Sequence, residues 1–207
     1  MDRTDERRER PWLSIASSSD GTKLAAGSET DGIFTSSDGG STWTQSIPFP
    51  NTEWNAITSS SDGNKLAVAS FSGPIRTSTD GGLTWYDNEP INQPQRAESI
   101  TSSSDGTKLA FVTAGSGLIE PGEIWTSTNG ACSGPNCVSW SKATTGLPPS
   151  SIFNPVPYQT ITSSFDGTKL AAGIYSGSIY TSSDGGATWT EQTNAGSRSW
   201  KSIASSA

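Results

Sequence analysis

Acidic side chains supply most of the groups that could do chemistry in this chain, because its 207 residues include no histidine. This composition excludes Ser-His-Asp and Cys-His catalysis and removes the commonest ligand of transition metals. Any catalysis would therefore fall to carboxylates, tyrosine, arginine or lysine. Glycoside hydrolysis is one reaction that needs only two carboxyl groups, about 5 to 10 Å apart across the sugar bond.

Carboxylates outside the repeated turns are the candidates for such a pair. Glu98 stands out, because equivalent positions of the other repeats hold Leu13, Asn55, Gln159 and Lys201. We interpret it either as an acid-base group or as a solvated charge, and no partner can be assigned to it. The other candidate carboxylates are Glu29, Asp31, Glu53, Asp87, Glu89, Glu120, Glu123 and Glu191.

The two cysteines lie close together in the sequence. Cys132 and Cys137 flank the tetrapeptide Ser-Gly-Pro-Asn, whose residues favour a turn that brings two thiols to bonding distance. The spacing predicts a disulfide, with a reduced structural pair as the alternative. Two cysteines without further ligands do not make a zinc site, and we expect no cofactor. A disulfide would indicate an extracellular or periplasmic protein.

The charge distribution restricts the partners. The net charge is -7, and the nine basic residues after Arg10 are scattered rather than clustered. We therefore expect no nucleic-acid partner. Residues 1–10 carry four arginines and four acidic residues, which predicts a solvated, disordered arm. No apolar run approaches the roughly 18 residues of a membrane helix, and no secretory signal is recognisable in this chain.

Two short phrases recur along the chain and dominate its organisation. The first, S-x-D-G-G-x-T-W, occurs at 36–43, 78–85 and 182–189, and in altered form from Ser127 to Trp140. The second, D-G-x-K-L-A, begins at Asp20, Asp62, Asp105 and Asp166. Successive copies of the second phrase are 42 and 43 residues apart at first, which is the length of one β-propeller blade.

Strand-like segments separate these turns. An isoleucine stands fourth in each expected first strand, at 12–17, 54–59, 97–102, 158–163 and 200–205. A Lys-Leu-Ala segment follows each Asp-Gly turn as the second strand. The third strands cover 33–36, 75–78, 124–127 and 179–182, and fourth strands begin near each Thr-Trp. Alternating side chains suit sheets that are covered on both faces.

The fold class predicted is all-β, a β-propeller of four-stranded blades. Four blades span about 11–53, 54–96, 97–157 and 158–199, and residues 200–207 begin a fifth. Either this last strand caps the array, or the chain is a fragment of a larger ring. The fragment interpretation is favoured, because rings normally close with complete blades.

One third-strand position carries residues suited to ligand contact. It holds Phe34, Arg76, Trp125 and Tyr180 in the four blades. The aromatic rings can stack on a ligand, or they simply pack within their strands.

The third blade departs from the pattern. Asn129 replaces the turn aspartate, and an insertion with both cysteines separates Gly130 from Trp140. An insertion of this kind either marks a face used for contacts or reflects drift.

The phrase S-x-D-G-G-x-T-W resembles the Asp-box, or bacterial neuraminidase repeat, of sialidase-like β-propellers. The resemblance covers nearly everything from Trp12 to Trp200. It implies that the box is a structural element between third and fourth strands, remote from any catalytic centre. The structural box residues are Ser36, Asp38, Gly40, Trp43, Ser78, Asp80, Gly82, Trp85, Ser127, Asn129, Trp140, Ser182, Asp184, Gly186 and Trp189.

Arginines test how far this resemblance extends. Sialidases of the superfamily hold the substrate carboxylate with three arginines, and no Arg-Ile-Pro phrase of their type is present. Beyond the arm the arginines are Arg76, Arg96 and Arg198. Arg76 lies in a strand and the other two in linkers, and the acidic chain offers an anionic sugar little compensating charge. These features disfavour sialidase catalysis.

The function expected is a non-catalytic propeller scaffold that presents loops to a protein or glycan. The alternative is a fragment of a sialidase-like or other glycoside hydrolase. The candidate binding residues are Phe34, Arg76, Trp125, Tyr180 and Glu98, and no catalytic or metal-binding residue is assigned.

Overall fold

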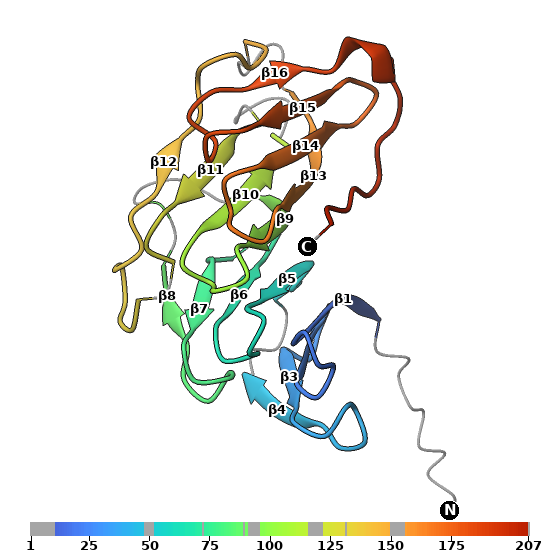
Figure 1. Ribbon diagram of the computed structural model, residues 1–207. Helices are drawn as coiled ribbons and strands as arrows, with labels where there is room; N and C mark the ends of the chain where they lie inside the picture. Colours follow the sequence, from blue (N-terminus) through green and yellow to red (C-terminus); the bar gives the residue numbers. More distant parts are fainter. Residues whose placement is uncertain are drawn as a thin grey trace, which may run out of the picture.

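The computed structural model describes residues 11–47, 52–71, 73–88, 90, 96–115, 122–130, 132–149 and 156–206. The expected arm, residues 1–10, lies outside these ranges. Within them the chain forms four antiparallel sheets of four strands, which confirms the predicted all-β fold class (Figure 1). The one helical segment described, η1 (Thr193–Ala195), has three residues, too few to cross a membrane.

Each sheet is a simple up-and-down blade of consecutive strands. Blade 1 comprises β1 (Trp12–Ser17), β2 (Leu24–Ser28), β3 (Ile33–Ser36) and β4 (Thr44–Ile47). Blade 2 comprises β5 (Ala56–Ser59), β6 (Leu66–Ala69), β7 (Arg76–Ser78) and β8 (Tyr86–Asp87). Blade 3 comprises β9 (Ala97–Ser102), β10 (Leu109–Thr113), β11 (Ile124–Ser127) and β12 (Ser141–Lys142). Blade 4 comprises β13 (Tyr158–Ser163), β14 (Leu170–Ile174), β15 (Ile179–Ser182) and β16 (Thr190–Glu191).

Most strands lie where the repeat pattern predicts them. β1, β9 and β13 have the expected bounds, whereas β5 begins at Ala56 rather than Trp54, and β7 at Arg76 rather than Ile75. Every fourth strand starts one residue after its tryptophan. The Asp-Gly turns form as expected, with the glycine at positive φ, for example +72° at Gly21, where a side chain would be strained.

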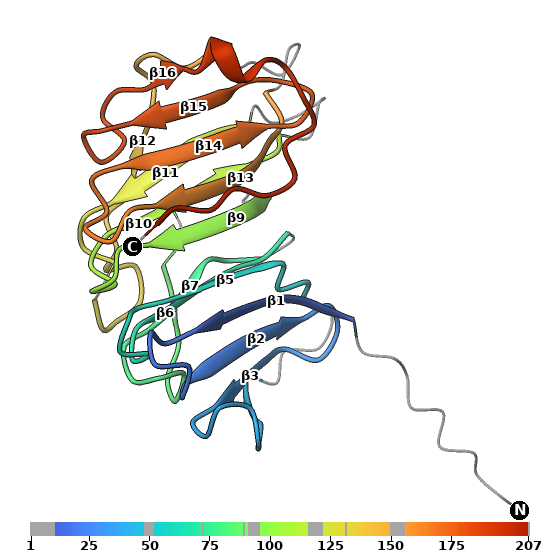
Figure 2. The same ribbon diagram turned by 45° about the vertical axis from the view of Figure 1, so that its right-hand side comes forward.

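The four blades lie side by side in an arc, each with its first strand toward the inner edge (Figure 2). The first strands contact one another in the order β1, β5, β9, β13. Three apolar clusters fill the three junctions between neighbouring blades. The core is therefore divided among the junctions rather than gathered in one centre.

Each junction pairs two different faces. We name the front face of a blade the one that bears the isoleucine of its first strand, and the back face the opposite one. At the first junction, Ala25 and Ile33 from the back of blade 1 pack against Trp54, Ile57 and Val68 from the front of blade 2. Clusters from equivalent positions fill the other two junctions. Every blade therefore needs a neighbour on each face to bury its apolar side chains.

Small and large residues are matched across these junctions. Gly27 lies beneath Trp54, so close that a Cβ added there would be 2.5 Å from the Trp54 carbonyl oxygen. Gly173 and Trp200 form the equivalent pair on blade 4, where an added Cβ would lie 2.9 Å from the Trp200 Cβ. Each of these glycines leaves the space that the tryptophan packed against it requires.

The segment expected as the first strand of a fifth blade differs from the prediction. Residues 200–206 are described, but they form no strand. Trp200 lies on Gly173 as Trp54 lies on Gly27, so the segment follows the course of a first strand. A strand needs a neighbouring strand with which to exchange backbone hydrogen bonds, and none of the described strands lies beside this segment in that way.

The close contact at Gly27 predicts a stability effect. Gly27→Ala should lower the free energy of unfolding by about 1 to 3 kcal/mol, because the new methyl group meets backbone atoms of Trp54 that cannot move aside. Ser183→Ala, on an exposed turn, is the control and should stay within about 0.5 kcal/mol of the parent. Urea unfolding of both variants measures this. Equal stability of the two variants would contradict the close packing.

Candidate functional site

The aspartates of the S-x-D-G-G-x-T-W turns are bound within their own turns. In blade 1, Asp38 Oδ1 accepts hydrogen bonds from the Ser36 hydroxyl at 2.8 Å and the Thr42 backbone N–H at 2.9 Å. Its Oδ2 accepts the Thr42 hydroxyl at 2.6 Å. The same bonds recur around Asp80 and Asp184. These carboxylates therefore close the turn between third and fourth strands.

The hydrogen bonds hold these carboxylates in the charged form. Bonds from the Thr42 hydroxyl, the Thr42 backbone and Ser36 lower the pKa of Asp38 to about 2. The corresponding bonds from Thr188 and Ser182 lower the pKa of Asp184 to about 2. An acid with so low a pKa is a poor proton donor near neutral pH. The turn aspartates consequently suit a structural role.

The Asp-Gly turns have a second partner that the sequence pattern did not predict. Lys23 donates to the Asp62 carbonyl oxygen of blade 2 at 3.0 Å. Lys65 and Lys108 donate in the same way to Asp105 and Asp166 of the following blades, each at 2.7 Å. The signal was present, since every second strand is preceded by lysine. We name this series of contacts the lysine ladder.

The four residues of the shared third-strand position lie on separate sheets, each on its own front face. Phe34 is half-buried and meets Trp12 edge-on, with 5.3 Å between ring centroids. Trp125 is half-buried and stacks on Phe111 at 6.3 Å. Tyr180 is buried in the cluster of the third junction, and burial raises the pKa of its hydroxyl. The structure does not bring these rings together into one surface, and their role in binding stays a prediction.

Arg76 and Glu98 have different surroundings. Arg76 forms an ion pair with Asp87 of the neighbouring strand, and its guanidinium carbon lies 5.4 Å from the centre of the Trp54 ring. Glu98 is half-buried on β9, where burial raises the pKa of its carboxyl group and the charge of Arg96 partly offsets that effect. Glu98 is thus the described acid whose pKa moves toward the range of a proton donor.

The insertion in blade 3 is closed by a disulfide and held by Asn129. Cys132 and Cys137 are bonded, with their Cα atoms 6.0 Å apart, as predicted. Asn129 Oδ1 accepts bonds from the Ser127 hydroxyl and the Ser139 backbone N–H, as the turn aspartates do. Its Nδ2 also donates to the Cys137 carbonyl oxygen at 2.9 Å. An aspartate at this position could not make that last bond, because a carboxylate has no N–H to donate.

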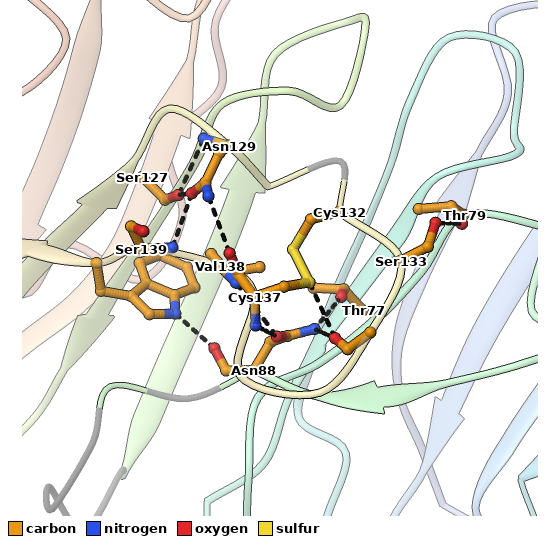
Figure 3. Close-up of a disulfide and its surroundings, with 12 residues drawn as sticks. Thr77, Thr79, Asn88, Ser127, Asn129, Cys132, Ser133, Cys137, Val138 and Ser139 are labelled. Carbon is orange, nitrogen blue, oxygen red and sulfur yellow. Dashed lines mark hydrogen bonds between the residues drawn. A yellow bond between two sulfur atoms is a disulfide. The ribbon is translucent and has the colours of Figure 1, made fainter.

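Asn88 of blade 2 joins the insertion to its neighbour (Figure 3). Its fully buried side chain donates to the Thr77 hydroxyl and the Gly134 carbonyl, and accepts from the Cys137 N–H at 2.8 Å. Its backbone carbonyl accepts the indole N–H of Trp140. The insertion therefore packs across the second junction. Sequence analysis missed Asn88, because nothing local marks a partner about 50 residues away.

Comparison with known proteins gives a consistent picture of the fold. No protein-family model matches the chain, and no similar protein of curated function was found. Solved structures do match. A GH74 xyloglucanase from Xanthomonas campestris superimposes with a TM-score of 0.63 at 20% identity, over 86% of this chain and 29% of that one. The fold is a β-propeller. The chain spans less than a third of that enzyme's length.

Two further structures show the same β-propeller likeness. A GH74 enzyme from Niastella koreensis gives a TM-score of 0.61 at 18% identity, over 83% of this chain and 28% of that one. A chain of a nidogen–laminin complex gives 0.62 at 13% identity, over 92% of this chain and 66% of that one. Among the described residues, no group of three or more potential metal ligands is found.

The low pKa of the turn aspartates predicts how stability depends on pH. The folded-state pKa of Asp184 is about 2, below its ordinary value of 3.8, so its contribution is present above about pH 4 and is lost as the pH falls toward 2. Asp184→Asn should therefore be less stable than the parent at pH 6, and the difference should shrink by pH 2. Chemical unfolding at several pH values measures it. A pH-independent difference, as we expect for Ser183→Ala, would contradict this assignment.

The buried amide of Asn88 predicts a large effect of a nearly isosteric change. Asn88→Asp replaces two donated hydrogen bonds with a buried charge that faces the Gly134 carbonyl, and should cost about 2 kcal/mol or more. Thr79→Val, which removes an exposed hydroxyl contact to Ser133, should change stability by less than about 0.5 kcal/mol. Urea unfolding compares them. If both substitutions changed the free energy of unfolding by the same small amount, the insertion would not be anchored at Asn88.

Proposed function

We propose that this chain is a non-catalytic β-propeller module that presents its blade-connecting turns to a protein or glycan partner. The observation that carries the proposal is that the repeated carboxylates hold the turns together. The aspartates of both turn phrases accept hydrogen bonds from neighbouring hydroxyl and backbone N–H groups. They make the turns rigid, and a rigid surface loses little entropy on binding.

We further propose that the four blades are Asp-box repeats, with the boundaries given by the repeat pattern. Support comes from the turns at 36–43, 78–85 and 182–189, which connect third to fourth strands and share one set of hydrogen bonds. The candidate binding residues Phe34, Arg76, Trp125, Tyr180 and Glu98 belong to this proposal. The disulfide supports an extracellular or periplasmic location, since such bonds persist in oxidising compartments.

A glycoside hydrolase fragment is the second candidate. Two of the similar structures are GH74 enzymes, and one is described as a xyloglucanase. Glu98, with its raised pKa, is the side chain on which this alternative would depend. The third similar structure is a protein complex, which agrees better with a binding module.

Xyloglucan oligosaccharides and sialyllactose distinguish the two candidates. Calorimetry measures their binding, and release of reducing sugar or sialic acid measures their hydrolysis. We expect no hydrolysis by the parent chain, and saturable binding would identify a glycan partner. Absence of both would restrict the proposal to a protein partner. Hydrolysis that is lost in Glu98→Gln would overturn the non-catalytic proposal.

A further inference from the structure

The front face of blade 1 is an apolar surface that no described residue covers. Trp12, Leu13, Ile15 and Trp43 are 54, 42, 63 and 39% exposed. With Ala26 they line a shallow groove on the sheet. We name this surface the open face.

The same positions are buried in every other blade. The counterparts of Ile15 are Ile57, Ile100 and Ile161, which are 7, 6 and 4% exposed. The counterparts of Trp12 are Trp54, Ala97 and Tyr158, each no more than 1% exposed. In each case the back face of the preceding blade covers them. The open face is therefore one half of a junction of known geometry.

The other half of such a junction lies at the opposite end of the array. Ala171 and Ile179 on the back of blade 4 are half-buried, whereas Ala25 and Ile33 on the back of blade 1 are buried. The back of blade 4 thus lacks the full cover that the first three back faces receive.

The same two ends of the array also carry the groups that make polar contacts at the junctions inside the chain. Lys169 is exposed and occupies the place in blade 4 from which Lys23, Lys65 and Lys108 reach the next blade. Gly21 has open space above it, whereas Gly63 lies directly against the Lys23 side chain. One end therefore offers the donor of a lysine-ladder contact, and the other offers its Asp-Gly turn.

A short segment of the chain lies on the back of blade 4. Trp200 rests on Gly173, and Ala204 and Ser205 lie near Thr162 and Lys169. Residues 200–205 read W-K-S-I-A-S, which differs from W-L-S-I-A-S of β1 at one position. The segment therefore has the sequence of the strand that forms the inner part of the open face, and it follows the course that a first strand takes on the preceding blade.

We propose that the open face of blade 1 docks onto the back of blade 4 of a second copy of this chain, and that segment 200–206 competes for that site. The contact continues the three junctions inside the chain, with Ile15 entering the apolar layer and Lys169 reaching the Asp20–Gly21 turn. Because the two surfaces differ, each contact is head-to-tail. In a two-fold dimer two such contacts form, and both ends of each copy are used.

Sedimentation over a wide concentration range tests the proposal with a matched pair of variants, one at the exposed Ile15 and one at the exposed Leu83. The parent should reach twice its 21.6 kDa mass as concentration rises. Ile15→Asp should remain monomeric, because it places a charge in the apolar junction. Leu83→Asp, at a leucine that is 84% exposed on a blade 2 turn, should associate like the parent. A parent that stays monomeric, or a dimer unaffected by Ile15→Asp, would overturn the proposal.

Mixing two variants tests the head-to-tail arrangement. Lys169→Glu should weaken self-association by turning the ladder contact into repulsion beside Asp20. Ile15→Asp keeps its blade 4 face and Lys169→Glu keeps its open face, so their mixture should form a heterodimer through the one intact pair of faces. No heterodimer would overturn the arrangement.

The competing segment has its own test. Trp200→Ala should loosen segment 200–206 and shift dimerisation to lower protein concentration. Unchanged or weaker association of Trp200→Ala would overturn the competition. Near-ultraviolet circular dichroism of each variant monitors folding, since Ile15, Lys169 and Leu83 are all exposed and their substitution should leave the fold intact.

Discussion

Contact between the back face of one blade and the front face of the next is the interaction on which the rest of this structure depends. Only 31% of the residues are hydrophobic, and they are arranged in thin sheets rather than around one centre. A blade by itself would leave Ile57 or Val68 in water, whereas stacking removes both from it. Stability therefore belongs to the junctions, as in other repeat proteins.

Polar groups define how the blades align. The lysine ladder attaches each of the first three blades to the Asp-Gly turn of the next, and a backbone bond such as Ser19 N–H to Ser61 carbonyl runs beside it. The apolar layer supplies free energy, and the match of Gly27 to Trp54 helps to align the first two blades, although hydrophobic contact by itself is not directional. Hydrogen bonds at one edge of each junction supply that direction.

The repeats made the architecture readable from the sequence, because each turn phrase is local and each strand has its own pattern. β1, β9 and β13 were predicted to the residue. Contacts between distant residues were not predictable in this way. Asn88 looks like an ordinary loop residue, and only the fold places it against Cys137. Residues 200–205 have a strand sequence, yet a strand also requires a partner with which to pair.

The candidate site was less predictable than the fold for a related reason. Phe34, Trp125 and Tyr180 share a position in the repeat, but a repeat places equivalent residues on successive blades rather than in one site. Shared position therefore placed each ring on the front face of its own sheet. The disulfide was the exception, because its two cysteines lie within one short turn.

The anchoring of the blade 3 insertion on Asn88 also bears on how such an array can evolve. The lysine ladder uses the same residue types in successive blades, so a duplicated blade would bring that contact with it. Blades 2 and 3 are joined in a further way, since Asn88 of blade 2 bonds to the cystine loop of blade 3. Separation of these two units would leave the buried Asn88 amide without its partners Gly134 and Cys137, so this pair of blades is less easily exchanged than a pair held by the repeated contacts alone.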